Sequence, residues 1–212
     1  MLLAGAAVGT AAALWAVSNR ISPKYKRPAS AEEYAARLED PAREAWQQPG
    51  RVVEVLRFRP EEIVADVGAG SGYFARRIAL RVSRVYAVDT DERLLRILAA
   101  GSPTNIHTVV AAPDDPRLPP ASVDTIFLCD TLHNLPGRRA YYPKLDRALR
   151  PGGRIVVIDR RKSAFPIGLL ERARLWESTV TGEFADAGYR LSETFDFLSR
   201  QYFMVFRRTT DQ

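Results

Sequence analysis

The stretch from Glu62 to Phe74 constrains the fold of this chain more than any other. It reads Glu-Ile-Val-Ala-Asp-Val-Gly-Ala-Gly-Ser-Gly-Tyr-Phe, a short apolar run that passes into glycines alternating with small residues. The residues from Phe74 to Ala79 then continue at helical spacing. This pattern predicts a buried strand, a tight glycine turn and a helix. Because glycine lacks a Cβ, such a turn lets a ligand approach the backbone at the amino end of the helix.

The nature of that ligand is indicated by the spacing of the glycines and by two carboxylates. Gly68-x-Gly70-x-Gly72 differs from the Gly-x-Gly-x-x-Gly of a pyrophosphate-binding turn. Asp66, two residues before the first glycine, suits a cationic ligand better than a diphosphate. A second predicted strand, Val85-Tyr86-Ala87-Val88-Asp89, ends in a carboxylate about twenty residues downstream, where α/β nucleotide folds place the acid that holds both ribose hydroxyls.

A third landmark completes a family resemblance. Residues 149–159 read as a helix end, a Pro151-Gly152-Gly153 turn and a buried strand. In order and spacing the three landmarks resemble the class I S-adenosylmethionine (SAM)-dependent methyltransferases, over roughly residues 61–208. The segment Arg43-Glu44-Ala45-Trp46-Gln47 is similar to one that precedes the glycine turn in a group of small bacterial methyltransferases. The resemblance implies an α/β, Rossmann-like, seven-stranded sheet, mostly parallel with a C-terminal antiparallel hairpin, and helices on both faces.

Composition limits the remaining classes of protein. A length of 212 residues with 46% hydrophobic residues fits one domain with an appendage. A single cysteine, Cys129, excludes an intrachain disulfide and provides no zinc-type cluster, so no metal site is predicted. The net charge is +6, but residues 1–27 contribute four basic residues and no acid, which leaves +2 for the rest. We therefore expect no nucleic-acid partner.

The amino-terminal residues predict a membrane attachment. Leu2 to Val17 are uncharged and are followed at once by a basic cluster. A helix of this length covers roughly 25 Å, slightly less than the ~30 Å hydrocarbon core. We expect a single-span anchor with the following domain in the cytoplasm, as positive residues after the span favour. A cleaved signal peptide, a mispredicted start and a loosely attached amphipathic segment are the alternatives. Gly5-x-x-x-Gly9 could pack two such helices into a weak homodimer, although small residues are common throughout this run.

The predicted organisation has three parts. Residues 1–27 form the hydrophobic anchor and its basic flank, residues 28–60 a helical N-terminal cap, and residues 61–212 the SAM-binding domain. In the cap, Ser30-Ala31-Glu32-Glu33 is a capping box, Asp40-Pro41 restarts a helix and Pro49-Gly50 ends it, before a short helix over 51–58. By resemblance Trp46 closes the cofactor pocket; the alternative is that it packs on the sheet.

The rest of the chain alternates between helices and strands. We expect helices over residues 91–100, 137–149 and 169–187, and strands over 106–110, 122–130, 189–198 and 201–208. The last two strands, separated by Ser199-Arg200, form a hairpin. By resemblance, this terminal hairpin distinguishes the methyltransferase fold from a plain dinucleotide fold.

The resemblance also assigns residues to the cofactor. Asp114 is expected to reach the adenine ring, with Asp115 as the second choice and a solvated turn as the alternative. Residues after the strand 122–130 face the methyl group and the acceptor. The expected cofactor-binding residues are Asp66, Gly68, Ala69, Gly70, Gly72, Asp89, Thr90, Asp114, Cys129 and Asp130.

His133 is the one histidine placed to act as a general base, since an unperturbed pKa near 6.5 suits that role. The alternative is that it caps the next helix or bonds to backbone. His107, inside a predicted strand, reads as structural, and Cys129 as a small core residue. Residues 160–166, which begin with Arg160-Arg161-Lys162, are expected to form a basic loop that could attract an anionic acceptor or lipid headgroups, or form a solvated rim.

Three functions are compatible with these features. The first is a SAM-dependent methyltransferase acting on a small-molecule or lipid-like acceptor, such as a quinone or a lipid precursor, at the membrane surface. The second is a non-catalytic SAM-binding or scaffold protein, against which the intact glycine turn and Asp89 argue. The third is a nicotinamide-dependent oxidoreductase, which the glycine spacing and the terminal hairpin disfavour. Nothing in the sequence encodes whether the acceptor atom is O, N, C or S.

Overall fold

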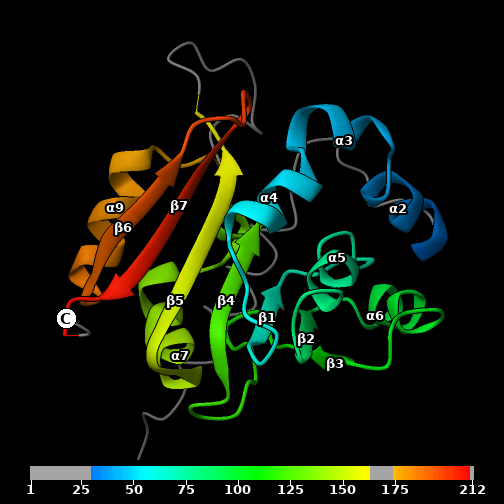
Figure 1. The fold of residues 1–212 in the computed structure, drawn as a ribbon, viewed down its shortest axis with the longest axis horizontal. Coiled ribbons are helices and arrows are strands. Elements are labelled where there is room, and N and C mark those ends of the chain that lie inside the picture. Colours follow the sequence, from blue (N-terminus) through cyan, green and yellow to red (C-terminus); the bar gives the residue numbers. More distant parts are fainter. Residues whose placement is uncertain (1–29, 163–173, 211–212) are drawn as a thin grey trace, which may run out of the picture.

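A seven-stranded sheet forms the centre of the protein in a computed structural model that describes residues 30–162 and 174–210 (Figure 1). Its order is β3-β2-β1-β4-β5-β7-β6, with the first five strands parallel and β7 antiparallel to both of its neighbours. This confirms the predicted Rossmann-like fold and its terminal hairpin. The strands are β1 (Ile63–Val67), β2 (Arg84–Asp89), β3 (Ile106–Val110), β4 (Val123–Cys129), β5 (Leu149–Arg160), β6 (Tyr189–Phe195) and β7 (Gln201–Arg208).

Helices cover both faces of the sheet. Successive side chains of a strand point to opposite faces, and both sets are apolar here. Val64 and Phe127 pack with α4 (Pro49–Val55), α5 (Ala75–Ala79) and α6 (Glu92–Ala99). Ala65 and Ile126 pack in a second core with α7 (Arg138–Ala148) and α9 (Glu177–Asp186). The central strands are therefore buried on both sides, as in other parallel sheets.

The strand order reverses next to β1, which pairs with β2 on one side and β4 on the other. In open α/β sheets, ligands bind outside the carboxyl ends of the strands at such a point. The glycine turn, Asp89 and the residues after Cys129 all follow these carboxyl ends. The topology thus brings the predicted site residues to one edge of the sheet.

Two short helices precede α4 and lie over this edge, α2 (Ala31–Leu38) and α3 (Ala42–Gln47) (Figure 1). Ser30 Oγ accepts from the amide of Glu33 at 3.0 Å, which confirms the capping residue of α2. The expectation that Pro49-Gly50 ends a helix is wrong. Gln48, in the left-handed region with φ 45°, ends α3, and Pro49 begins α4, because the fixed φ of proline suits the first helical position.

Two other expected boundaries also differ. The helix expected over residues 169–187 begins at Glu177; residues 174–176 are not helical, and 163–173 lie outside the described residues. Pro151-Gly152-Gly153 lies within β5 instead of preceding it. Val123 of β4 faces Leu149 while Thr125 faces Arg154, so the extra residues are absorbed as an irregularity in the strand.

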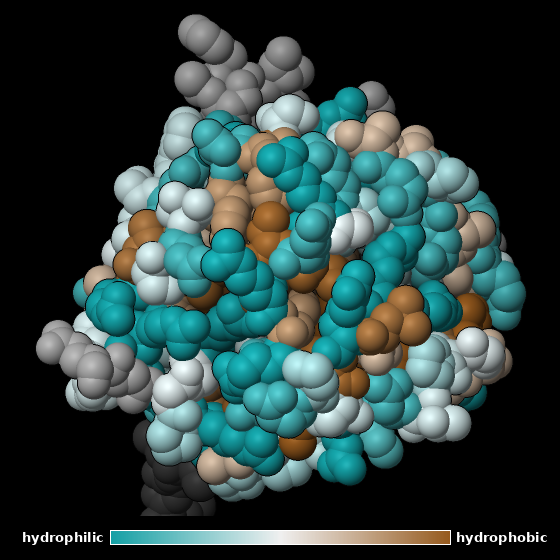
Figure 2. All heavy atoms as spheres, viewed as in Figure 1, coloured by the Kyte–Doolittle hydropathy of each residue, from teal (hydrophilic) through white to brown (hydrophobic). Residues whose placement is uncertain are grey.

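The predicted membrane segment, residues 1–27, also lies outside the described residues. Across residues 30–162 and 174–210, no helix is long and apolar enough to cross a membrane. The face in Figure 2 is mostly hydrophilic, with apolar residues in scattered groups. The large apolar side chains that are exposed in the described residues are Leu80, Val110, Trp176 and Leu191.

Candidate functional site

The glycine turn, residues 68–72, is held tightly against β2. The amides of Gly68 and Ala69 both donate to the carbonyl oxygen of Val88, at 2.8 and 3.0 Å. Gly68 has a φ of +82°, and a Cβ placed on it would lie 2.1 Å from Thr131 Oγ1. A residue larger than glycine would therefore have to displace Thr131 and adopt an unfavourable φ. The turn brings its backbone close to the residues that follow β4.

Asp66, on β1, is a buried carboxyl group whose hydrogen bonds are incomplete within the described residues. Its side chain is 3% exposed, and Oδ2 has no hydrogen-bond partner among the described residues. Burial, reinforced by the nearby charge of Asp89, raises the pKa of Asp66 to about 7, against the opposing effects of the Ala75 amide and Arg43. An unpaired buried acceptor is costly. The site therefore fits a ligand that brings a cationic N–H donor, which the amino group of SAM provides.

Asp89, at the end of β2, joins the glycine turn to α6. Oδ2 accepts from the amide of Gly70 at 2.8 Å, and Oδ1 accepts from the amide of Asp91 at 2.9 Å. Burial raises the pKa of Asp89, while these amides and that of Thr90 oppose the rise. The carboxylate thus lies beside the turn, as expected of a group that accepts from ribose hydroxyls.

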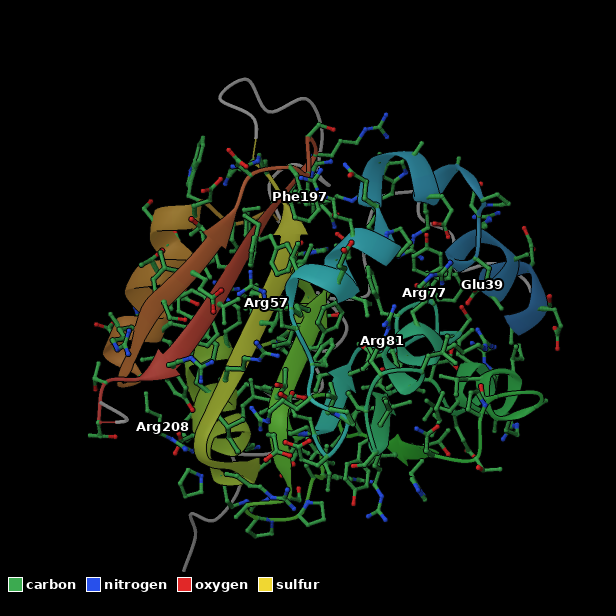
Figure 3. The ribbon with its side chains drawn as sticks, viewed as in Figure 1. Glu39, Arg57, Arg77, Arg81, Phe197 and Arg208 are labelled. Atoms are coloured by element: carbon green, nitrogen blue, oxygen red, sulfur yellow. The ribbon has the colours of Figure 1, made fainter. Side chains whose placement is uncertain are left out.

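The α2–α3 region (residues 31–47) is tied to the glycine turn and α5 by charged and polar contacts. Glu39 Oε1 accepts from Ser71 Oγ at 2.6 Å and pairs with Arg76 at 3.2 Å. Glu44 pairs with Arg77. In Figure 3, Glu39 and Arg77 lie close together where this region meets α5. These contacts hold α2 and α3 over the turn.

Arg43 and Gln47 were not predicted as site residues, although both belong to the Arg-Glu-x-Trp-Gln segment. Their spacing places them on one face of α3, and Arg43 Nε donates to Gln47 Oε1 at 2.8 Å. The Arg43 guanidinium lies 3.8 Å from the centre of the Tyr73 ring and close enough to Asp66 to lower its pKa. The signal in the sequence was this pair at i and i+4 ahead of the glycine turn.

Gln47 is fully buried and forms the floor of the site with residues from β4 and β7. Its Nε2 lies 3.1 Å from Cys129 Sγ and 3.4 Å from Asp130 Oδ2, while Gln201 Nε2 donates to Asp130 Oδ1 at 3.0 Å. Burial raises the pKa of the Cys129 thiol well above its usual range. Cys129 is therefore held as a thiol and is a poor nucleophile.

His133 forms a dyad with a buried carboxylate. It lies in a short 3₁₀ helix after β4, and Nδ1 is 2.7 Å from Oδ1 of Asp159, a residue of β5 that is 1% exposed. The backbone amide of His133 also donates to Asp159 Oδ2, at 3.1 Å. With Nδ1–H donated to Asp159, Nε2 keeps a lone pair that can accept a proton. The arrangement is that of an oriented base.

Asp114 is not drawn into this cluster by any described contact. Its exposed carboxylate pairs with Lys144 of α7 at 3.1 Å, and this neighbour lowers its pKa. The second choice, Asp115, accepts from the amide of Arg117 at 2.7 Å. Whether either residue reaches adenine stays a prediction.

Trp46 lies beside the guanidinium groups of Arg160 and Arg200.

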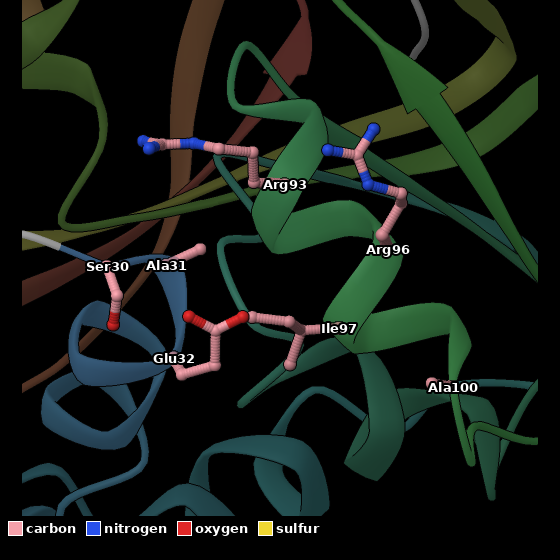
Figure 4. Close-up of a pocket in the computed structure, with 7 residues that line it drawn as sticks. All are labelled: Ser30, Ala31, Glu32, Arg93, Arg96, Ile97 and Ala100. Atoms are coloured by element: carbon pink, nitrogen blue, oxygen red, sulfur yellow. The ribbon is translucent and has the colours of Figure 1, made fainter.

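A separate groove of about 410 Å³ lies between α2 and α6 (Figure 4). It contains none of the predicted site residues. The described residues also contain no group of three or more His, Cys, Asp or Glu side chains that could hold a metal ion.

Comparisons with known proteins agree with this geometry. Residues 65–157 match the sequence model of a methyltransferase domain family. An uncharacterised methyltransferase of Mycobacterium tuberculosis is 35% identical over 110 residues, which is 52% of this chain and 44% of that protein. A ubiquinone/menaquinone biosynthesis C-methyltransferase of Hydrogenovibrio crunogenus is 24% identical over 130 residues, 58% of this chain and 50% of that protein. The chain thus spans about half the length of these relatives.

A solved structure shares the fold over most of the chain. A SAM-dependent methyltransferase from Aquifex aeolicus superposes with a TM-score of 0.73 at 22% identity, covering 82% of this chain and 96% of that one.

Proposed function

We propose that this chain, whose residues 65–157 match the model of a methyltransferase domain family, is a class I SAM-dependent methyltransferase that transfers a methyl group to a small-molecule or lipid-like acceptor. One observation carries the proposal. The buried carboxyl of Asp66 and the glycine turn lie at the same edge of the sheet as an oriented histidine, His133 on Asp159. One side thus suits a cationic nucleoside and the other suits the removal of a proton.

The cofactor is SAM, and when bound it supplies a methyl group on a sulfonium that a nucleophile can attack. Asp66 would hold its amino group, the backbone of residues 68–70 would lie against its methionine part and ribose, and Asp89 would accept from the ribose hydroxyls. Arg43, beside Asp66, would supply a positive charge for the carboxylate of the cofactor's methionine part. The contacts of Glu39 and Glu44 with the turn and α5 keep α2 and α3 in place, and so help to exclude water.

His133 would accept the proton that the acceptor loses, at Nε2. Asp159 fixes the ring by its 2.7 Å contact with Nδ1 and stabilises the positive charge that forms on the imidazole. Since alignment with the methyl carbon supplies much of the catalysis in such a reaction, the base is needed only for an acceptor whose attacking atom carries a proton. The dyad supports an acceptor of that kind.

A lipid-like acceptor at a membrane is the finer part of the proposal. The apolar run Leu2–Val17 would anchor the chain, with the domain on the cytoplasmic side. The Hydrogenovibrio relative is a ubiquinone/menaquinone biosynthesis enzyme, which supports a quinone-type acceptor for this chain as well. A weak homodimer through residues 5–13 belongs to the same proposal.

The test is transfer of radiolabelled methyl groups from SAM into a membrane extract and into a small-molecule extract of the same cells. Wild-type protein should label an extractable product. His133→Ala should lower the rate by about 10²–10⁴-fold with unchanged calorimetric affinity for SAM. His107→Ala is the matched control, because His107 is an exposed histidine of β3 away from the carboxyl edge.

Each outcome separates the competing functions. SAM binding without any labelled product would favour a non-catalytic SAM-binding or scaffold protein. Binding of NAD in place of SAM would favour an oxidoreductase, against which the inserted strand β7 already argues. Full activity of His133→Ala would reject the base and leave methyl transfer standing.

A further inference from the structure

Two arginines from distant parts of the chain meet on one tryptophan at the carboxyl edge of the sheet. The guanidinium carbon of Arg160 lies 5.1 Å from the centre of the Trp46 ring, and that of Arg200 lies 5.6 Å from it. Arg160 ends β5, Arg200 lies in the turn between β6 and β7, and Trp46 belongs to α3. Cation–π contacts of this kind position a guanidinium but leave its charge and its N–H donors available.

Of the two guanidinium groups, only that of Arg160 has an ion-pair partner among the described residues, and this pair is long. Arg160 Nε is 3.6 Å from Asp130 Oδ1, which is longer than a hydrogen bond. That oxygen already accepts from Gln201 at 3.0 Å. Arg200 is exposed and has no ion pair within residues 30–162 and 174–210. In contrast, the next residue after Arg160, Arg161, pairs with Glu177.

The backbone of Arg160 contacts the carboxylate that orients the proposed base. The backbone amide of Arg160 donates to Asp159 Oδ1 at 2.7 Å, and the same oxygen is 2.7 Å from His133 Nδ1. Asp159 and Arg160 are consecutive, so their Cα atoms are about 3.8 Å apart. Their side chains leave opposite faces of β5, but both stand at the carboxyl end of the strand. An acceptor that lies across this end can face His133 and reach the guanidinium groups.

We propose that Arg160 and Arg200, held by Trp46, bind a carboxylate carried by the methyl acceptor while the acceptor's ionisable hydroxyl faces His133. The acceptor class is thus a hydroxy acid, and this rests on the proposed methyl transfer. The planar guanidinium matches the two oxygens of a carboxylate. Two such groups on one rigid aromatic ring are preorganised, which reduces the entropy lost on binding.

The test is calorimetric titration of the full-length protein, first with S-adenosylhomocysteine and then, on the saturated protein, with two probes. The probes are 4-hydroxybenzoate and its neutral methyl ester, which differ in the charge of one group. We expect the acid to bind at least about tenfold more tightly than the ester. Raising the salt from about 50 to 500 mM should weaken only the acid, because screening acts on charge.

Arg200→Gln should lower the affinity for the acid by about tenfold and leave the ester unchanged. Arg190→Gln is the matched control, since Arg190 is an exposed arginine of β6 beside Arg207, at the other end of the hairpin. Equal binding of acid and ester would overturn the proposal, as would wild-type affinity of Arg200→Gln for the acid or no binding of either probe.

The first titration keeps the two proposals apart. Failure to bind S-adenosylhomocysteine would count against the methyltransferase function itself. Normal binding of the nucleoside followed by no preference for the acid would refute the carboxylate site alone.

Discussion

Replacing Asp66 by asparagine should stabilise the unliganded protein and weaken its cofactor site at the same time. Asp66 is 3% exposed, and burial raises its pKa from 3.8 to about 7. At about 1.4 kcal/mol per pKa unit, this rise corresponds to about 4 kcal/mol of differential free energy between the protonated and ionised forms. An asparagine at this position would keep the shape of the side chain without the ionisation. Above pH 7, Asp66→Asn should therefore recover up to about 4 kcal/mol of unfolding free energy.

The sign follows from proton binding. Between pH 3.8 and about 7 the folded protein holds a proton on Asp66 that the unfolded chain has released. Raising the pH through this window therefore lowers the free energy of unfolding, and the loss is complete just above pH 7. Asp89 and Asp130, whose pKa values are also raised by burial, act in the same direction. Only the difference in the free energy of unfolding between wild type and Asp66→Asn isolates the contribution of Asp66.

Urea unfolding at pH 5, 6, 7 and 8 would measure that difference. The free energy of unfolding of Asp66→Asn, relative to that of wild type, should rise by about 1.4 kcal/mol per pH unit between pH 5 and 7 and level off by pH 8. Asp196→Asn is the control, because Asp196 is exposed and has no hydrogen bond in the described part of the chain. A variant that is less stable than wild type at pH 8, with an unchanged pH slope, would refute the reasoning.

The affinity for SAM should rank wild type and Asp66→Asn in the opposite order to their unfolding free energies. With SAM present at pH 8, the ionised Asp66 gains a cationic partner, so wild type should bind SAM more tightly than the variant by about 1–3 kcal/mol. This advantage should shrink at pH 5.5, where Asp66 is protonated. Calorimetry at the two pH values gives both numbers, and an equal affinity of the two proteins at pH 8 would remove Asp66 from the site.

Three further predictions concern other parts of the chain. Gly68→Ala should lower stability by about 1–3 kcal/mol and abolish SAM binding, because its Cβ would meet Thr131 Oγ1 at 2.1 Å; denaturant unfolding and calorimetry measure both, and unchanged values would contradict the tight turn. Asp89→Ala should weaken SAM binding by about 1–3 kcal/mol, and an unchanged calorimetric affinity would exclude Asp89 as a ligand. Deleting residues 1–27 should release the protein from membranes, a result that fractionation of both forms tests and that soluble full-length protein would rule out.

The fold could be predicted because its signals are local. The strands Ile63–Val67 and Arg84–Asp89 are apolar runs closed by glycine or aspartate, and they appear within one or two residues of their expected positions. The predicted helix and strand boundaries were wrong where a residue fits two kinds of local structure. Pro49 can follow one helix or begin the next, and the register of β4 on β5 decides that Pro151-Gly152-Gly153 stays inside a strand. Neither choice is visible in the local sequence.

The sequence named candidate residues on both sides of the site, but it indicated how they are assembled only on the nucleoside side. Asp66, the glycines and Asp89 belong to contiguous motifs, whereas the other side is assembled by long-range contacts. The contact of Gln47 with Cys129 spans 82 residues, and that of His133 with Asp159 spans 26. Asp159 appeared in the sequence only as the end of a strand, and nothing local indicates which histidine it would orient. The sheet topology supplies that information.

The insertion of β7 between β5 and β6 has a consequence for the synthesis of the chain on the ribosome. Gln201, the first residue of β7, donates to Asp130 at 3.0 Å and lies beside Gln47, so the last strand to emerge supplies part of the floor built by the first helices. A nascent chain that has not yet exposed residues 201–208 can form the glycine turn but has an open edge at β5. Premature termination before residue 201 should therefore yield an incomplete sheet with no functional acceptor side.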